Sequence, residues 1–422
     1  MKTVFTNGVW DIFHYGHYNL LRRAKDFGDY LLVGVASDES CEKYKREPNQ
    51  PWHVRANSVK NLNFVNEVIK TEWSRDLDEK FYKRYDINYQ VQGDGGSGFH
   101  TAEKLGILKI IGRTKGVSTT KIENVLEKNT HKGLEGGFIN DIKQSFADNK
   151  LYVIKQGQRE KGRIYNIDAP ACRIYNEYES IMSFRSSLNN PKYIVNPICF
   201  DADSYTIVFE SAPKQAGLLS QRLLENRVDK NQIVKISKSL ADMHNSTLNN
   251  TYLMEKFNET ECFKKFKIQT QCYNINTDDK TKEKIREIVN NSLKIKKVLL
   301  HGDVAPKNIL VWDDNFLFID FEESSYSDPA IDISYLIAHF NLYGEEFYDC
   351  AKKVYDTYMS NIKYYDPDFE DRISKYVGIF MLSRVDGKAK ANFIDDERKD
   401  KIRDISKKLI FGKIKNTDLH DN

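Results

Sequence analysis

The chain lacks the cysteine spacing that would hold a small fold together. Its six cysteines are scattered over 422 residues, with no Cys-x-x-Cys pair and no nearby histidine at the spacing of zinc ligands. Disulfide frameworks and structural zinc sites both need such spacing, so neither is expected. We instead expect free thiols with mainly structural roles at Cys41, Cys172, Cys199, Cys262, Cys272 and Cys350.

Long apolar runs and a dominant charge are also missing. No stretch approaches the roughly 18 apolar residues of a membrane span, and the first strand-like run begins near Thr3, too early for a cleavable leader. A cytoplasmic protein without a membrane span is therefore expected. Lys and Arg number 64 and Asp and Glu number 61, so charge gives no reason to expect a nucleic-acid partner.

The chain is longer than one hydrophobic core usually supports, and its pattern changes near residue 130. Before this point, apolar strand-like runs alternate with amphipathic helical runs, which predicts a parallel sheet with crossover helices. After it, strand-like runs come first and a largely helical remainder follows, which indicates an α+β domain. We therefore expect two domains, at residues 1–130 and 131–422.

The first candidate site lies in residues 5–29, FTNGVWDIFHYGHYNLLRRAKDFGD, where His14 and His17 form an H-x-G-H pair. Gly8 ends an expected strand where the backbone must approach a ligand, and Asp11 begins the segment that leads to a helix N-terminus, which attracts phosphate. Fixed donors around a phosphate lower the barrier to its transfer, because negative charge builds up there in the transition state. The segment predicts a nucleotidyl-transfer site.

A second segment supports this interpretation. A histidine pair alone would more often serve ordinary hydrogen bonding, but residues 113–122, RTKGVSTTKI, add an arginine, a glycine turn and three hydroxyl side chains at an expected helix start. Hydroxyls there are usually caps, yet beside an arginine they also suit a phosphate. We assign Arg113 to the reaction centre and Ser118, Thr119 and Thr120 to nucleotide binding.

With these motifs, residues 1–125 resemble the cytidylyltransferase family that includes the glycerol-3-phosphate, phosphocholine and phosphoethanolamine enzymes. The segment NGVWDIFHYGH is nearest the ethanolamine-phosphate type. The resemblance implies a Rossmann-like α/β fold, CTP with Mg²⁺ as donor, and attack of a phosphomonoester on the α-phosphate with loss of pyrophosphate. It also allows a homodimer formed through the N-terminal domain.

The same resemblance carries roles to four further positions. It implies that Lys45 contacts phosphate at the reaction centre, that Arg55 and Trp73 lie on the substrate side, and that Asp94 helps to bind the nucleotide. The chain departs from the family where HVR has no acidic residue before Arg55, and where GDGGSG has no second acidic residue after Asp94. Both departures fall on the acceptor and nucleoside side, so the reaction type is better defined than the substrate.

The second candidate site lies in residues 301–320, HGDVAPKNILVWDDNFLFID. Asp303 and Asn308 have the D-x-x-x-x-N spacing that places a carboxylate at a substrate hydroxyl and an amide on a metal ion. Asp320 ends an apolar strand, where a carboxylate can hold Mg²⁺ against the phosphates of ATP. Lys155 stands upstream in an expected strand, LYVIKQG, where a lysine is otherwise awkward. These residues predict an ATP-dependent phosphotransferase.

Residues 135–422 resemble the choline and ethanolamine kinase and aminoglycoside phosphotransferase superfamily, with IDFEESSYSDPAIDISYL nearest the choline kinase type of bacteria. The resemblance implies a bilobal, protein-kinase-like α+β fold. It also implies that Lys155 binds the ATP phosphates and that Glu177 pairs with it, with Glu179 as the competing choice. Asp328 and Asp332 are expected to brace the catalytic loop rather than touch substrate.

Together the two halves predict a bifunctional enzyme. The C-terminal domain would phosphorylate a small amino alcohol, such as ethanolamine or choline, and the N-terminal domain would convert the phosphomonoester and CTP into a CDP-alcohol and pyrophosphate. The amino alcohol is favoured by analogy, because these two activities form a metabolic pair in that branch. Three alternatives stay open: glycerol phosphate or a polyol phosphate as acceptor with a kinase of other specificity, an adenylyltransferase in front, or a catalytically silent regulatory domain. The product could serve phospholipid or surface-polysaccharide synthesis.

Overall fold

The computed structural model describes residues 1–44, 47–60, 62, 64–72, 77–94, 98–112, 114, 132–133, 140–147, 150–157, 173–201 and 204–419. The chain forms two compact units, the first made of Met1–Gly157 and Pro197–Glu210 and the second of Gln158–Asn196 and Ser211–Asn422. Within the described ranges, no helix is long and apolar enough to cross a membrane.

The first sheet of the first unit has five parallel strands in the order β3-β2-β1-β4-β5. They are β1 (Thr3–Gly8), β2 (Tyr30–Ala36), β3 (Glu67–Thr71), β4 (Ile87–Gly93) and β5 (Leu108–Ile111). The crossover helices are α1 (Tyr15–Lys25), α2 (Asp38–Tyr44), α3 (Trp52–Lys60), α4 (Glu79–Arg84) and α5 (His100–Lys104). Because helices cover both faces, β1 and β2 are buried along nearly their whole length. The Rossmann-like α/β prediction is confirmed.

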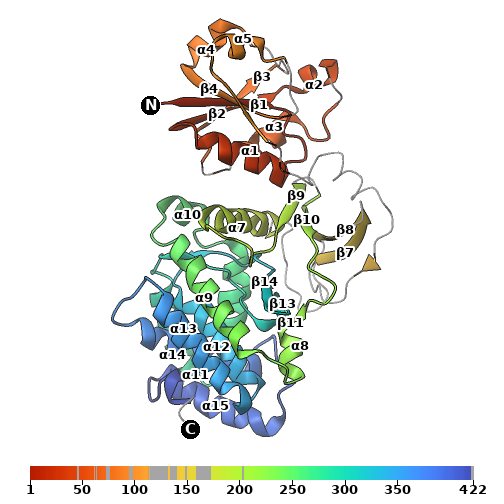
Figure 1. Cartoon of the computed structure of the whole chain (residues 1–422). Helices are drawn as coiled ribbons and strands as arrows, with labels where there is room; N and C mark the ends of the chain where they lie inside the picture. Colours follow the sequence, from red (N-terminus) through yellow and green to blue (C-terminus); the bar gives the residue numbers. More distant parts are fainter. Residues whose placement is uncertain are drawn as a thin grey trace. The chain divides into compact units, whose positions relative to one another are not determined.

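The strand order of this sheet places a ligand-binding edge. In Figure 1, α1 and α3 lie on one face and α4 and α5 on the other, and the order reverses between β1 and β4. Doubly wound sheets bind ligands at such a point, outside the carboxyl ends of the strands. Since β1 ends at Gly8 and β4 at Gly93, the H-x-G-H segment and Asp94 both follow strands that end at this edge.

A second, antiparallel sheet of the first unit has the order β6-β7-β8-β10-β9. Its strands are β6 (Lys132–Gly133), β7 (Asn140–Ala147), β8 (Lys150–Gly157), β9 (Pro197–Asp201) and β10 (Thr206–Glu210). Lys155 lies in β8 between Ile142 of β7 and Ile207 of β10, and it is 5% exposed. The predicted lysine in an apolar strand is therefore present and buried.

An apolar cluster joins the H-x-G-H segment to this second sheet. Ile12 packs against residues of β8, β9 and β10, namely Tyr152, Ile154, Ile198, Cys199 and Val208. Next to it, His14 forms an isolated antiparallel bridge with Cys199. Trp10 and Ile12 have positive φ values, 59° and 43°. A left-handed backbone costs such residues about 1–3 kcal/mol, so the surrounding packing must hold the loop in this shape.

The second unit is mainly helical. Its helices are α7 (Arg173–Ser187), α8 (Leu219–Leu224), α9 (Lys230–Ser246), α10 (Thr251–Lys256), the π-helix η1 (Phe263–Tyr273), α11 (Asp279–Ser292), η2 (Pro306–Asn308), α12 (Ala330–Tyr343), η3 (Glu345–Phe347), α13 (Tyr348–Asn361), α14 (Phe369–Asp386), α15 (Asp396–Ile410) and η4 (Asn416–Leu419). Helix α12 is buried at every position except Tyr343, which fits an apolar helix at the centre of a bundle. It packs against α13 and α14 (Figure 1).

Two short sheets of the second unit position its polar loops. One has the order β11-β13-β14, built from β11 (Gly217–Leu218), β13 (Ile309–Trp312) and β14 (Asn315–Phe318), and the other pairs β12 (Val298–Leu299) with β15 (Tyr326–Ser327). Asp303 lies between β12 and β13, and Asp320 lies between β14 and β15. Strands precede a mostly helical remainder, so the predicted α+β class of the kinase-like half is confirmed.

Two candidate active sites

The two histidines of the first site meet at the N-terminus of α1. Their rings stack with centroids 3.7 Å apart and planes 15° apart. His14 is the N-cap residue, and its Nδ1 accepts a hydrogen bond from the backbone N of His17 at 3.3 Å. The rings of Trp10 and Phe13 pack against His17. The sequence prediction that these imidazoles lie together at a helix start is confirmed in the geometry.

Burial determines the charge of His14. The side chain is 6% exposed, and its segment bridges to Cys199. Burial lowers the pKa of His14 to about 4, and a hydrogen bond to the backbone offsets only part of this effect. The imidazole is therefore neutral at pH 7, and it can act at a phosphate as a hydrogen-bonding group rather than as a cation.

Gly8 has a structural reason to be glycine. A Cβ at this position would lie 2.7 Å from the indole ring of Trp10. That ring is fixed by its Nε1, which donates to the backbone O of Gly34 at 2.8 Å. The absence of a side chain at Gly8 thus lets Trp10 close over the end of β1 and pack against His17.

Asp11 holds the segment before α3. Its carboxylate accepts hydrogen bonds from the backbone N of Asn49 at 3.0 Å, from the side-chain Nδ2 of Asn49 at 2.8 Å and from the backbone N of Gln50 at 3.1 Å. Gln50 in turn donates through Nε2 to Oδ1 of Asp201 at 3.2 Å. Asp11 therefore shapes the loop beside the histidines, and its predicted contact with the nucleotide stays a prediction.

Arg55 is part of the scaffold. It is fully buried and its guanidinium donates to the backbone oxygens of Gln50, Val9 and Ala36 and to Oδ1 of Asp38, the last at 2.6 Å. Val9 follows β1, Ala36 ends β2, Asp38 begins α2 and Gln50 lies just before α3. The structure thus gives Arg55 a positioning function that sequence reasoning missed, and its role in substrate binding stays a prediction.

The segment that follows β5 begins beside α1. Nδ2 of Asn19 donates to Oγ1 of Thr114 at 3.2 Å, and Nη1 of Arg23 donates to the backbone O of Gly112 at 2.7 Å. Asp94 is exposed at the end of β4, where its backbone N donates to the O of Ile111. The remaining assigned residues of this site lie outside the described residues and stay predictions: Lys45, Trp73, Arg113, Ser118, Thr119 and Thr120.

Asp303 of the second site is buried and ionised. Its Oδ2 accepts from Nδ2 of Asn308 at 2.8 Å and pairs with Nζ of Lys307 at 2.8 Å, while its Oδ1 accepts from Nζ of Lys267 at 3.1 Å. Burial alone would raise the pKa of Asp303, but the charges and hydrogen bonds of Lys307 and Lys267 outweigh it and hold the pKa well below its usual range. A carboxylate in this state can accept a hydrogen bond from a substrate hydroxyl, although its low pKa makes it a weak base.

The loop that carries Asp303 is braced by Asp332, as predicted, whereas Asp328 instead pairs with Nε of Arg372 at 2.7 Å. The carboxylate of Asp332 accepts from the backbone N of His301 at 2.7 Å and of Gly302 at 3.1 Å, and it also meets Nε2 of His244 at 3.2 Å. Gly302 has φ +90°, and a Cβ there would lie 2.2 Å from the backbone O of Glu323. The loop therefore requires glycine at this position.

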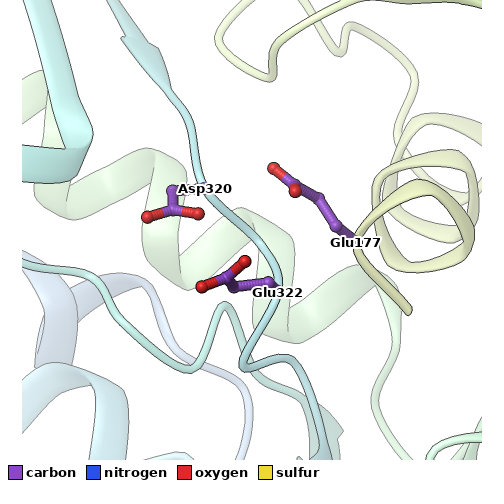
Figure 2. Close-up of side chains that lie close together, drawn as sticks. All are labelled: Glu177, Asp320 and Glu322. Carbon is purple, nitrogen blue, oxygen red and sulfur yellow. The ribbon is translucent and has the colours of Figure 1, made fainter. Parts of the chain in front are cut away.

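Three carboxylates of the second unit lie close together beside α7. Glu177 extends from α7 toward Asp320 and Glu322, which lie on the segment after β14 (Figure 2), and one oxygen of each lies within 4.8 Å of the others. Asp320 has φ 68°, an uncommon backbone conformation that turns this segment. Oxygen donors of this kind suit Mg²⁺, so the residues present fit the predicted metal.

The three carboxylates that the structure brings together differ from the set that the sequence predicted. Glu322 was not among the predicted residues, although it stands only two positions after Asp320; it also pairs with Nε of Arg173 at 3.3 Å. Glu179, the competing choice for Glu177, instead pairs with Nζ of Lys256. Of the two glutamates on α7, only Glu177 joins the described carboxylate group.

A buried lysine beside Asp303 was also missed. Lys267 of η1 is fully buried, and its Nζ lies 3.4 Å from Oε2 of Glu323 and 3.4 Å from the ring centroid of Tyr335. Burial alone would lower the pKa of Lys267, but Tyr335, Glu323 and Asp303 outweigh it and raise the pKa, so the side chain is an ammonium. No sequence signal identifies it, because its segment, FKKFKIQTQCY, holds three lysines and nothing in the pattern distinguishes Lys267 from the other two.

Comparisons with known proteins match each site to a different family. Residues 5–125 match the model described as cytidylyltransferase-like, and residues 215–359 match the phosphotransferase enzyme family. The ethanolamine-phosphate cytidylyltransferase of Arabidopsis thaliana is 40% identical over 129 residues, which cover 28% of this chain and 31% of that protein. The glycerol-3-phosphate cytidylyltransferase of Bacillus spizizenii is 36% identical over 125 residues, 29% of this chain and 95% of that protein.

Among solved structures, the choline kinase of Streptococcus pneumoniae is 18% identical and aligns over 69% of this chain and 97% of its own, with a TM-score of 0.43.

Proposed function

Because this chain belongs to the cytidylyltransferase-like family through residues 5–125, and carries a phosphotransferase-family domain over residues 215–359, we propose that it performs two successive reactions on one small alcohol. The domain limits proposed for the two activities are residues 1–130 and 131–422. Two arrangements support the proposal: the stacked imidazoles at the start of α1, and, in the second unit, the ionised Asp303 together with a group of three carboxylates.

In the first reaction, the alcohol oxygen attacks the γ-phosphorus of ATP and the bond to ADP breaks. Asp303 orients the hydroxyl and finally accepts its proton. Because the pKa of Asp303 is low, it takes the proton only late in the transfer, and orientation is its main contribution. Lys155 is proposed to bind the ATP phosphates. Glu177, Asp320 and Glu322, together with Oδ1 of Asn308, would hold Mg²⁺.

Magnesium, when bound, would neutralise negative charge on the ATP phosphates and orient them for transfer. Asn308 favours this assignment through its orientation. Its Nδ2 donates to Asp303, which turns the amide oxygen, the atom that a metal ion would take, to the other side.

In the second reaction, an oxygen of the phosphomonoester attacks the α-phosphorus of CTP, and the bond to pyrophosphate breaks. His14 and His17 are proposed to donate hydrogen bonds to the phosphate oxygens that gain charge, which fits a His14 that is neutral at pH 7. The free N–H groups at the start of α1 add to this donor set. The product is a CDP-alcohol.

Two substrate classes remain candidates for the alcohol. Ethanolamine or choline is the class that the sequence analysis favoured, and the similarity to an ethanolamine-phosphate cytidylyltransferase supports it. Glycerol or another polyol is the second class, supported by the similarity to a glycerol-3-phosphate cytidylyltransferase.

A phosphorus NMR time course tests the proposal. The full chain is incubated with Mg²⁺, ATP and CTP and, in separate samples, choline, ethanolamine, glycerol or ribitol. We expect a phosphomonoester signal that gives way to the diphosphate signals of a CDP-alcohol in at least one sample. CDP-alcohol formation only from supplied phosphomonoesters, without ATP turnover, would overturn the kinase step and leave a silent C-terminal domain.

A further inference from the structure

We propose that Lys267 is a resident cation that makes the alcohol site of the kinase-like domain select substrates without positive charge. The inference rests on the proposed kinase reaction and narrows its substrate to a neutral alcohol, such as a polyol, in preference to choline or ethanolamine. It is carried by the position of one ammonium group relative to Asp303, Glu323 and two aromatic rings.

The ammonium of Lys267 occupies the kind of place in which a protein would hold a cationic ligand. Its Nζ lies 3.4 Å from the ring centroid of Tyr335 and 5.8 Å from that of Phe380. On its other sides are Oδ1 of Asp303 at 3.1 Å and Oε2 of Glu323 at 3.4 Å. Aromatic faces and carboxylates together recognise ammonium groups. Here the chain itself supplies the ammonium.

The position of Lys267 is unusual for a lysine. Its side chain is fully buried, and lysine is almost never fully buried unless it is paired. It is carried by η1, an eleven-residue π-helix, a rare element that is often found at functional sites. A role at the protein surface therefore does not explain why a lysine stands at position 267. Its partners are Asp303 itself, Glu323 and Tyr335.

A substrate that reaches Asp303 must also meet Lys267. A hydroxyl that bonds to Oδ1 at about 2.8 Å lies within about 6 Å of the lysine Nζ, because Nζ itself is 3.1 Å from that oxygen. The buried carboxylate of Asp303 is already paired with two lysine ammonium groups, those of Lys267 and Lys307. The ammonium of a bound amino alcohol would add an unmatched positive charge to a buried site, which disfavours binding.

Glu323 offers the complementary contact for a neutral substrate. Its side chain is buried, and its Oε2 has no hydrogen-bond partner among the described residues, although the lysine charge stands 3.4 Å away. A buried acceptor without a donor favours a ligand that brings one. A second hydroxyl of a polyol can donate to this oxygen, whereas a quaternary ammonium has no N–H to give.

Matched ligand pairs test charge selection directly. Choline is compared with dimethylbutanol, its neutral carbon isostere, and ethanolamine with ethylene glycol, by ligand-observed NMR titration of the full chain with Mg²⁺ and a non-hydrolysable ATP analogue. We expect the wild-type protein to bind each neutral partner at least tenfold more tightly. Lys267→Met should abolish or reverse this preference, and Lys267→Arg, which keeps the charge, should retain it.

Equal or tighter binding of the charged partners by the wild-type protein would overturn the inference, as would a preference unchanged in Lys267→Met. If Lys267→Met does not fold, Lys267→Gln, which also removes the charge, takes its place with the same ligand pairs. Failure of the proposed function is distinguishable: phosphorus NMR would then show no phosphomonoester from any alcohol, while the binding preference would be present.

Discussion

The imidazole of His14 lies against that of His17 with ring centroids 3.7 Å apart, so a change of charge on either ring is felt by the other. Two imidazolium rings at this distance would repel each other strongly, because two like charges would stand close together beside the buried side chain of His14. The pair therefore carries at most one positive charge near neutral pH. A negatively charged phosphate can then be received mainly by hydrogen bonding.

This relationship predicts an unusual titration of His14. In histidine-selective NMR, we expect its ring signals to stay constant from pH 8 to about 5.5 and to move only near pH 4. Since the pKa is lower in the folded chain than in the unfolded chain, unfolding takes up protons in acid. His14 thus contributes stability that is complete above about pH 6.5 and is lost as the pH falls toward 4. A midpoint near 6.5 in the folded protein would contradict the buried geometry.

A substitution in one active site should remove the activity of that site and leave the activity of the other intact. Asp303→Ala is expected to abolish ATP-dependent phosphorylation, because the substrate hydroxyl loses the carboxylate that orients it, while cytidylyl transfer to supplied phosphomonoester continues. His17→Ala should do the reverse, with a loss of about 10²–10³-fold in kcat for cytidylyl transfer. Phosphorus NMR with each substrate set measures both rates, and loss of both activities in either variant would contradict the two-site arrangement.

Glu322 is predicted to be a metal ligand. Glu322→Gln should weaken binding of Mn²⁺, used as a probe for Mg²⁺, by about tenfold or more in electron paramagnetic resonance titrations without nucleotide. Glu179→Gln is a matched control, because Glu179 lies on α7 with Glu177 but pairs with Lys256 outside the carboxylate group. Equal Mn²⁺ affinity in the wild-type protein and Glu322→Gln would remove Glu322 from the metal site.

Substitution of Arg55 distinguishes a structural role of this residue from a role in substrate binding. Arg55→Lys should lower the free energy of unfolding by on the order of 3 kcal/mol, because a lysine is unable to serve the backbone acceptors and Asp38 together. Scanning calorimetry measures this, with Arg22→Lys as a control, since Arg22 makes an exposed pair with Asp26. An unchanged unfolding transition with a higher KM for the phosphomonoester would instead support the substrate role.

The extent to which sequence could predict the sites depends on how local each feature is. Asp303 and Asn308 were found because five residues of spacing and a short 3-10 turn bring them together. Lys155 was found because a lysine interrupts an apolar strand. Lys267 was missed because only the fold of η1 brings it to Asp303, and nothing local distinguishes it from neighbouring lysines.

Burial was the second property that sequence could not supply. The family resemblance placed Arg55 near substrate by position alone, whereas the structure surrounds it with the backbone oxygens of Val9, Ala36 and Gln50. The neutral state of His14 likewise depends on β9, a strand far from it in sequence. Charge states and positioning contacts follow from tertiary packing, which a motif does not describe.

The bridge between His14 and Cys199 also sets an order of events during synthesis. The H-x-G-H segment leaves the ribosome early, but the strand that buries Ile12 and His14 is translated about ten seconds or more later. Until then Ile12 has no apolar partner from β8, β9 or β10. A fragment that stops near residue 130 would keep this isoleucine uncovered, so a first domain produced alone should be more prone to aggregate and easier for proteases to cut at its own active-site loop.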